Sequence, residues 1–191
     1  MKIRSYSNVN FWCFNENGFQ IMNSGQAVIG IAFDSKNENH NRIVLNNFNS
    51  GDSTFFDFKH SENISNLIAN EELGTVLSAG FDKILVQYDL RSGKVTKNYG
   101  DIGIYDIQSS AISGRFAIFG GQTEFKFINL TKKEIIYTNY IRTNSIYVYT
   151  LEFGRVKDEI VLICGGDSSV VNIYHLGEVL NNSLLYVPEG K

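Results

Sequence analysis

The chain has 191 residues, of which 43% are hydrophobic and 19% charged, and its formal net charge is −3. This composition is typical of a globular domain with a core and excludes a disordered chain. Because the charge is slightly negative and Lys and Arg do not cluster, the sequence also argues against nucleic acid or an anionic membrane surface as a partner.

The two cysteines, Cys13 and Cys164, lie far apart in apolar stretches. That placement is typical of buried thiols in a reducing compartment. No apolar signal region follows Met1, and the longest apolar run, Ile160–Cys164, is too short to span a bilayer. We therefore expect an intracellular, cytoplasmic protein, with the nucleus also open.

Four segments repeat one pattern along the chain: an apolar strand ending at a glycine, a short turn, and a second strand ending in a large apolar residue and a polar one. In chain order they are Gln20–Gly25 with Ala27–Asp34, Thr75–Gly80 with Ile84–Leu90, Phe116–Gly121 with Glu124–Leu130, and Val161–Gly166 with Val170–Leu176. The closing glycines recur at intervals of 55, 41 and 45 residues (25 to 80, 80 to 121, 121 to 166). A period near 40–45 residues with several strands per unit predicts β-propeller blades.

Further apolar runs flank each pair and complete four-stranded units. The runs expected as first strands are Val9–Phe14, Ile64–Ala69, Ile104–Ser109 and Tyr147–Phe153, and those expected as fourth strands are Arg42–Phe48, Lys94–Tyr99, Glu134–Thr138 and Ser183–Val187. The predicted blades cover about 8–48, 60–99, 103–139 and 145–188. The first interval is about ten residues longer than the others, which indicates a long loop or an added strand around Asn49–Lys59.

The stretch Ile64–Tyr99 resembles a WD repeat, the unit of the WD40 β-propeller family. In that family a His before the first strand, a Ser or Thr in the second, an Asp in the next turn and a Trp in the third form a buried hydrogen-bonded network. The resemblance implies that His60, Ser78 and Asp82 take the first three places, and Tyr88 stands where Trp is common. Such a network satisfies buried polar atoms and fixes the geometry of a blade.

The other blades depart from this pattern. The third has Asn129 where the family often has Asp, and it has no His at its start. The fourth has Asp167 and Ser168 near the place of the turn Asp, and Tyr174-His175 in place of Trp-Asp. The first shows no clear network. We predict an all-β, WD40-type propeller segment of about four four-stranded blades over residues 1–191.

Four blades form fewer than the usual seven of WD propellers, so two apolar terminal faces would stay uncovered. Three explanations are open at this point. The chain is a fragment that lacks blades, it completes its ring with a second chain, or it closes as a small propeller with Ile3–Ser7 completing the last blade.

Residues with catalytic or metal-binding spacing are scarce. The three histidines, His40, His60 and His175, show no ligand spacing with one another or with a cysteine. The glycine pairs precede strands rather than helices, so they do not form a phosphate loop. We expect no metal, no cofactor and no enzymatic activity.

The sequence therefore predicts a non-catalytic scaffold that binds other proteins through its blade loops. Candidate contact residues are Phe55 and Phe56 in the extra segment, and Phe81 and Lys83 beside Asp82. One alternative is a targeting or substrate-recognition propeller cut from a larger multidomain enzyme. Another is a propeller that binds a small ligand at a central channel.

Overall fold

The structure is a computed structural model that describes residues 18–34, 39–104, 107–122, 124–136, 147–157, 159–167 and 170–177. These residues form antiparallel β-sheets, with one short 3-10 turn at Asn23–Gly25 (η1). The chain divides into two compact units, 1–107 and 108–191. In the described ranges, no helix has the length and apolar character needed to cross a membrane.

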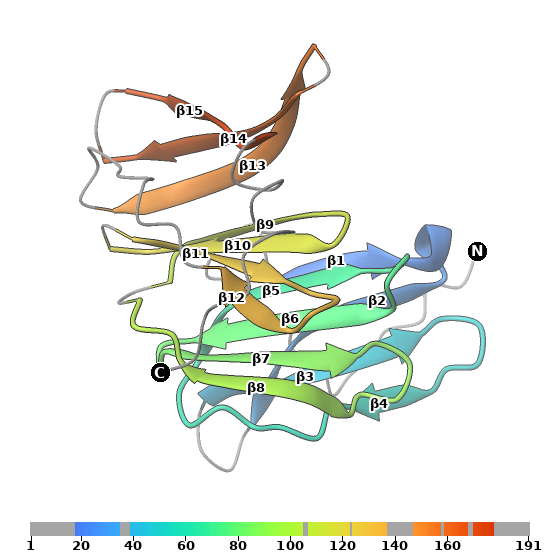
Figure 1. The fold of residues 1–191 in the computed structure, drawn as a ribbon. Helices are drawn as coiled ribbons and strands as arrows, with labels where there is room; N and C mark the ends of the chain where they lie inside the picture. The colour runs from blue at the N-terminus through green and yellow to red at the C-terminus, as the bar shows by residue number, and fades with distance from the viewer. Residues whose placement is uncertain are drawn as a thin grey trace. The chain divides into compact units, whose positions relative to one another are not determined.

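The first sheet, in unit 1, runs in chain order β1-β2-β3-β4 (Figure 1). Its strands are β1 (Phe19–Met22), β2 (Ala27–Asp34), β3 (Asn39–Asn47) and β4 (Ser53–Phe55). Each strand pairs antiparallel with the next, so this sheet is a meander of consecutive hairpins. Consecutive hairpins place each strand beside its neighbour in the sequence, which is the connection pattern predicted for a blade.

The second sheet is also a four-stranded meander and packs face to face on the first. Its strands are β5 (Ile64–Asn70), β6 (Thr75–Gly80), β7 (Ile84–Asp89) and β8 (Val95–Asp101). Alternate residues of both sheets form one core, with Ile29 and Ile43 from the first and Val76 and Tyr88 from the second. The side chain of Gln20 adds two polar links, because it donates to the Ala69 carbonyl at 3.3 Å and accepts from the Ala69 amide at 3.0 Å.

Unit 2 repeats this arrangement with a third and a last sheet. Their strands are β9 (Ser109–Ser113), β10 (Phe116–Gly120), β11 (Phe125–Asn129) and β12 (Glu134–Ile136), then β13 (Val148–Val156), β14 (Glu159–Gly166) and β15 (Asn172–His175). The two sheets share a core that includes Phe127 and Leu162. Where they meet, the hydroxyl of Ser109 donates to the Val148 carbonyl at 3.0 Å. In the described residues the last sheet has three strands.

One turn marks the end of the third strand in the first three sheets. The side chains of Asn47, Asp89 and Asn129 each accept backbone amides from the residues that follow. The turn closes at a residue with positive φ: Gly51 (79°), Gly93 (67°) and Lys133 (57°). These Asx turns recur at intervals of 42 and 40 residues (47 to 89, 89 to 129), which is a regular blade period.

The phase predicted for the first blade is wrong by one strand. Gln20–Gly25 and Ala27–Asp34 were expected as second and third strands, but they contain β1 and β2, the first two strands of the described sheet. The expected fourth strand, Arg42–Phe48, is the third strand β3. A strand, a glycine and a second strand describe any hairpin, so the pattern alone does not identify which hairpin of a blade it marks.

The surplus around Asn49–Lys59 contains β4, the fourth strand of the first sheet, so this sheet extends beyond the expected boundary at residue 48. The strand expected at Ile104–Ser109 is also displaced, since β9 begins at Ser109. Ile104 and Ile107 are buried, and the Asn66 side chain donates to the Ile107 carbonyl at 3.0 Å. The apolar character of this connector therefore reflects burial rather than strand pairing.

Several predicted segments lie outside the described residues. They are Ile3–Ser7, Val9–Phe14 with Cys13, and Ser183–Val187, together with the last residues of Glu134–Thr138. The remaining flanking strands agree with the prediction: Ile64–Ala69 lies in β5, Lys94–Tyr99 largely in β8 and Tyr147–Phe153 largely in β13.

Candidate functional site

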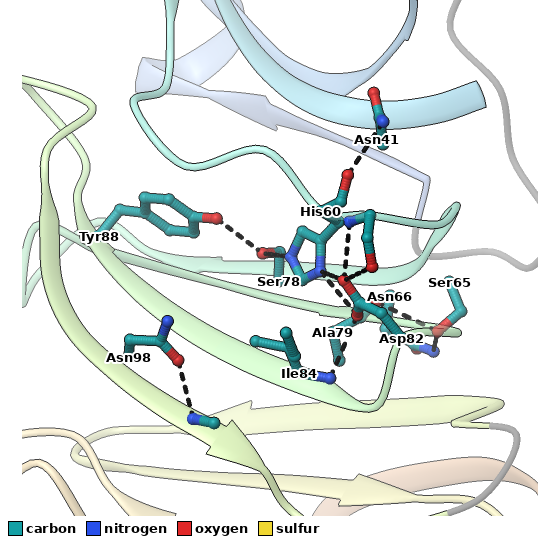
Figure 2. A network of polar contacts seen from close by, with 12 residues as sticks. Asn41, His60, Ser65, Asn66, Ser78, Ala79, Asp82, Ile84, Tyr88 and Asn98 are labelled. Atoms are coloured by element: carbon teal, nitrogen blue, oxygen red, sulfur yellow. Dashed lines mark hydrogen bonds and ion pairs between the residues drawn. The ribbon is translucent and has the colours of Figure 1, made fainter. Parts of the chain in front are cut away.

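A chain of four polar side chains runs through the second sheet (Figure 2). His60 lies in the connection between β4 and β5, where its amide donates to the Asn41 carbonyl at 3.1 Å. Its Nδ1 is 3.0 Å from both carboxylate oxygens of Asp82, in the β6–β7 turn. Its Nε2 is 2.7 Å from Ser78 Oγ on β6, and that oxygen is 3.0 Å from the Tyr88 hydroxyl on β7. The structure thus brings together all four side chains that the resemblance implied.

Burial makes the direction of these hydrogen bonds important. His60 is 1% exposed, and Ser78 and Tyr88 are 0% exposed. A neutral imidazole protonated at Nδ1 satisfies every member, because Tyr88 then donates to Ser78, Ser78 donates to Nε2, and Nδ1–H donates to the carboxylate. A buried network without an orphaned member holds its side chains in one arrangement.

The Asp82 carboxylate is also held by the backbone. It accepts the amides of Ser61 at 3.0 Å and Ile84 at 3.1 Å. Burial by itself would raise the pKa of Asp82, but the hydrogen bond and electrostatic attraction of the His60 Nδ1–H, with the two amides, lower it below the usual value. The carboxylate is therefore stabilised in its charged form.

Tyr88 shows the opposite effect. Burial raises the pKa of its hydroxyl well above the usual value, the hydrogen bond with Ser78 lowers it in part, and the Asp82 charge raises it further. The phenol therefore remains a neutral hydrogen-bond donor. With His60, Ser78 and Tyr88 buried and the Asp82 side chain 4% exposed, the network is placed to fix the β6–β7 turn.

That turn presents the two remaining candidate residues of this region. The Phe81 amide donates to the Asn63 carbonyl at 3.0 Å, and the Lys83 carbonyl accepts the Ile102 amide at 3.2 Å. Lys83 has a φ of 64°, in the left-handed region, and its amide donates to the Gly80 carbonyl. Both side chains are partly exposed. Phe81 and Lys83 therefore flank the buried Asp82 on a turn whose backbone is anchored on both sides.

The prediction that Phe56 is an exposed contact residue is wrong. Phe56 is 1% exposed, and its ring centre lies 5.2 Å from that of Tyr88. It also packs closely on Gly93, where a Cβ would lie 3.0 Å from the Phe56 ring. Its neighbour Phe55 is 46% exposed, with the Arg42 guanidinium 4.8 Å from its ring centre. Since strand residues alternate between faces, only one of two adjacent phenylalanines reaches solvent.

The turn positions of the last sheet differ from those of the second. Asp167 accepts the Tyr147 amide at 3.3 Å through its side chain, and its own amide donates to the Tyr147 carbonyl. Ser168 lies outside the described residues. His175 pairs with Glu159 at 2.7 Å in an exposed position. The two sheets therefore share a backbone link at this turn, from Asp167 to Tyr147 in the last sheet and from Phe81 to Asn63 in the second. The last-sheet counterparts of His60 and Asp82 lie outside the described residues.

A second buried polar chain in the second sheet was not predicted. The Gln87 side chain donates to Thr75 Oγ1 at 2.9 Å and accepts the Tyr99 hydroxyl at 2.8 Å. Gln87 is 3% exposed, and burial raises the pKa of Tyr99. The sequence signal for this link was Gln87, the single polar residue within the apolar strand Ile84–Tyr88. Gln87 and Tyr88 point to opposite faces, so this sheet has a polar link on each face.

Metal ligands do not gather in the described ranges, where no group of three or more His, Cys, Asp or Glu side chains could hold an ion. Cys164 is a buried cysteine in the core of unit 2.

The sequence matches no family model and no curated protein. Among solved structures, the chain is similar to the computationally designed Ika4 protein, with a TM-score of 0.63 and 16% identity over 80% of this chain and 86% of Ika4. It is also similar to the computationally designed Ika8 protein, with a TM-score of 0.65 and 14% identity over 84% of this chain and 46% of Ika8. At these identities the likeness concerns the fold alone.

Proposed function

We propose that the chain is a WD-repeat β-propeller segment that acts as a non-catalytic scaffold and binds a protein partner at the β6–β7 turn. The observation that supports this most is the use of the polar side chains. The buried network holds the β6–β7 turn in place through His60, Ser78, Asp82 and Tyr88. On the same turn, the side chains of Phe81 and Lys83 are partly exposed. A fixed turn loses little conformational entropy when it binds, which is what a recognition element needs.

The chemistry of the turn indicates what its partner offers. Phe81 provides aromatic surface for an apolar side chain, and Lys83 provides a cation for a carboxylate. Interfaces of this kind concentrate their binding energy in a few aromatic and cationic anchors. Phe55 lies on the first sheet rather than on this turn, so it is not part of the proposed contact.

The test is capture of a partner from cell extract on the full chain, followed by measurement of its affinity for variants. Phe81→Ala and Lys83→Glu should each weaken binding about tenfold or more, as expected for anchors worth ~1.4 kcal/mol or more. Lys97→Glu, an exposed lysine on β8, is the matched control and should leave the affinity unchanged. Equal loss in the control and the two turn variants would contradict the proposal, and so would a partner bound equally well by all of them.

A metabolite screen by thermal melting separates the small-ligand alternative from this proposal. A ligand that binds only the folded state raises the melting temperature, and the shift grows with the logarithm of the ligand concentration divided by Kd. A saturable shift that survives in the Phe81→Ala variant would favour a small-ligand site elsewhere in the protein.

A further inference from the structure

The third strand of the last sheet is exposed at positions that are buried in the other sheets. The turn residues Asn47, Asp89 and Asn129 end the third strands of the first three sheets, and His175 is their counterpart in the last. In all four sheets, the backbone amide of the residue after this position donates to a carbonyl at or just before the start of the second strand. These bonds run from Phe48 to Gln26, Leu90 to Gly74, Leu130 to Arg115 and Leu176 to Ile160. Positions can therefore be compared by counting back from these four residues.

On the third strands of the first and third sheets, the positions four and two residues before the turn residue carry core side chains. They are Ile43 and Leu45 in the first sheet and Phe125 and Phe127 in the third, and in both units the next sheet covers them. The same count in the last sheet gives Val171 and Ile173, which are 65% and 55% exposed. Among the described residues, the last sheet thus has the apolar residues of a covered face but no sheet packed against them.

One cross-strand row of this open face runs across β13, β14 and β15. Glu152, Ile163 and Ile173 lie opposite one another on β13, β14 and β15 and point to the same side. Gly154 and Gly165 lie on this side too, since paired and alternate strand residues share a face. The face therefore carries apolar residues and glycines together with the exposed Glu152 and the exposed Glu159–His175 pair. Such a surface can pack against another sheet.

The first sheet has exposed apolar residues on the face turned away from its own core. Phe19, Gly30, Val44 and Phe55 form one cross-strand row. Val44 is already buried, whereas Phe19 and Phe55 at the ends of the row are 49% and 46% exposed. Ile21, two residues from Phe19 on β1, is 62% exposed.

The same face carries a positive charge. Arg42, two residues before Val44 on β3, lies over the Phe55 ring. The first sheet thus offers apolar residues and a cation, and the last sheet offers apolar residues and an anion. The two faces are complementary in chemistry.

We propose that the open face of the last sheet binds the outer face of the first sheet of a second copy of this chain, with Glu152 of one copy facing Arg42 of the other. This association uses neither Phe81 nor Lys83 and is independent of the proposed partner site.

Size-exclusion chromatography with light scattering on the full chain tests the proposal. The wild type should show a concentration-dependent mass above that of one chain. Ile173→Glu places a charge on the open face and should weaken association at least tenfold. Leu73→Glu, at an apolar residue on the β5–β6 turn that is 45% exposed, should not. Ile173 is exposed, so the substitution removes no core contact, and circular dichroism checks the fold.

The charge pair identifies the partner surface. Glu152→Arg and Arg42→Glu should each weaken association, and the double variant should restore it. A monomeric wild type would overturn the proposal, as would association that survives both Ile173→Glu and Glu152→Arg. Association that is weakened by each single charge reversal without rescue in the double variant would overturn the assignment of the first sheet as the partner surface.

Discussion

The described residues contain two histidine–carboxylate pairs in opposite settings. His60 and Asp82 lie in the second sheet at 3.0 Å, with side chains 0% and 4% exposed. His175 and Glu159 lie in the last sheet at 2.7 Å, with side chains 62% and 63% exposed. The shorter pair is the weaker one, because water screens an exposed ion pair and competes for its hydrogen bonds.

The comparison contrasts a buried polar network with an exposed ion pair. The second sheet holds its β6–β7 turn with a sealed polar network, whose members depend on one another. The described part of the last sheet has at this turn the backbone link between Asp167 and Tyr147, which the second sheet also has between Phe81 and Asn63. Variants that disturb the two sheets in matched ways should therefore give unequal losses of stability.

The largest difference is expected between the two histidines. His60→Ala removes the partner of Asp82 and Ser78 inside the protein and should lower the free energy of unfolding by about 2–4 kcal/mol. His175→Ala removes an exposed pair and should cost less than about 0.5 kcal/mol. Urea denaturation of both variants measures this, and equal losses would show that the buried network is not the stabilising element.

Glycine substitutions give the next largest contrast. A Cβ at Gly80 would lie 2.8 Å from Asp82 Oδ1 and 2.9 Å from His60 Nδ1, so Gly80→Ala pushes on the network and should cost about 1–3 kcal/mol. At Gly165 the close neighbour, at 2.8 Å, is the Cγ2 of the exposed Thr150, which can rotate away. Gly165→Ala should therefore have the smaller effect in thermal melting, and the reverse order would contradict this account.

Removal of one hydroxyl should have a smaller effect. Tyr88→Phe keeps the ring against Phe56 but loses the hydrogen bond with Ser78, which should cost about 1 kcal/mol. Tyr149→Phe, an exposed tyrosine on β13, serves as the control and should leave stability unchanged in the same denaturation assay.

The smallest effect concerns pH. The pKa of Asp82 is lowered in the folded state from the ordinary 3.8. Its contribution to stability is complete above that ordinary value and is lost as the pH falls through the lowered folded pKa. The stability difference between the wild type and Asp82→Asn should therefore shrink below about pH 3.8. A difference that stays constant down to pH 2 would show that the Asp82 charge does not contribute.

The sequence predicted the second sheet and its network well, because local signals agreed there. Gly80 ends β6, the turn Asp82 follows, and the alternation in β7 places Tyr88 on the same face as Ser78. The first sheet was predicted one strand out of phase, since Gly25 and Asp34 fit the same local pattern. The choice between Asp34 and Asn47 as the end of the third strand depends on strand pairing, which a local pattern does not contain.

What the sequence by itself determined is therefore the all-β class, the period and the residues of the His60 network, because glycines, turn residues and strand alternation act over short distances. Tertiary structure alone decided which of Phe55 and Phe56 is buried, which hairpin begins the first sheet, and that Val171 and Ile173 are exposed. Each of these depends on which surface lies across from a side chain, and residues far apart in the chain supply that surface.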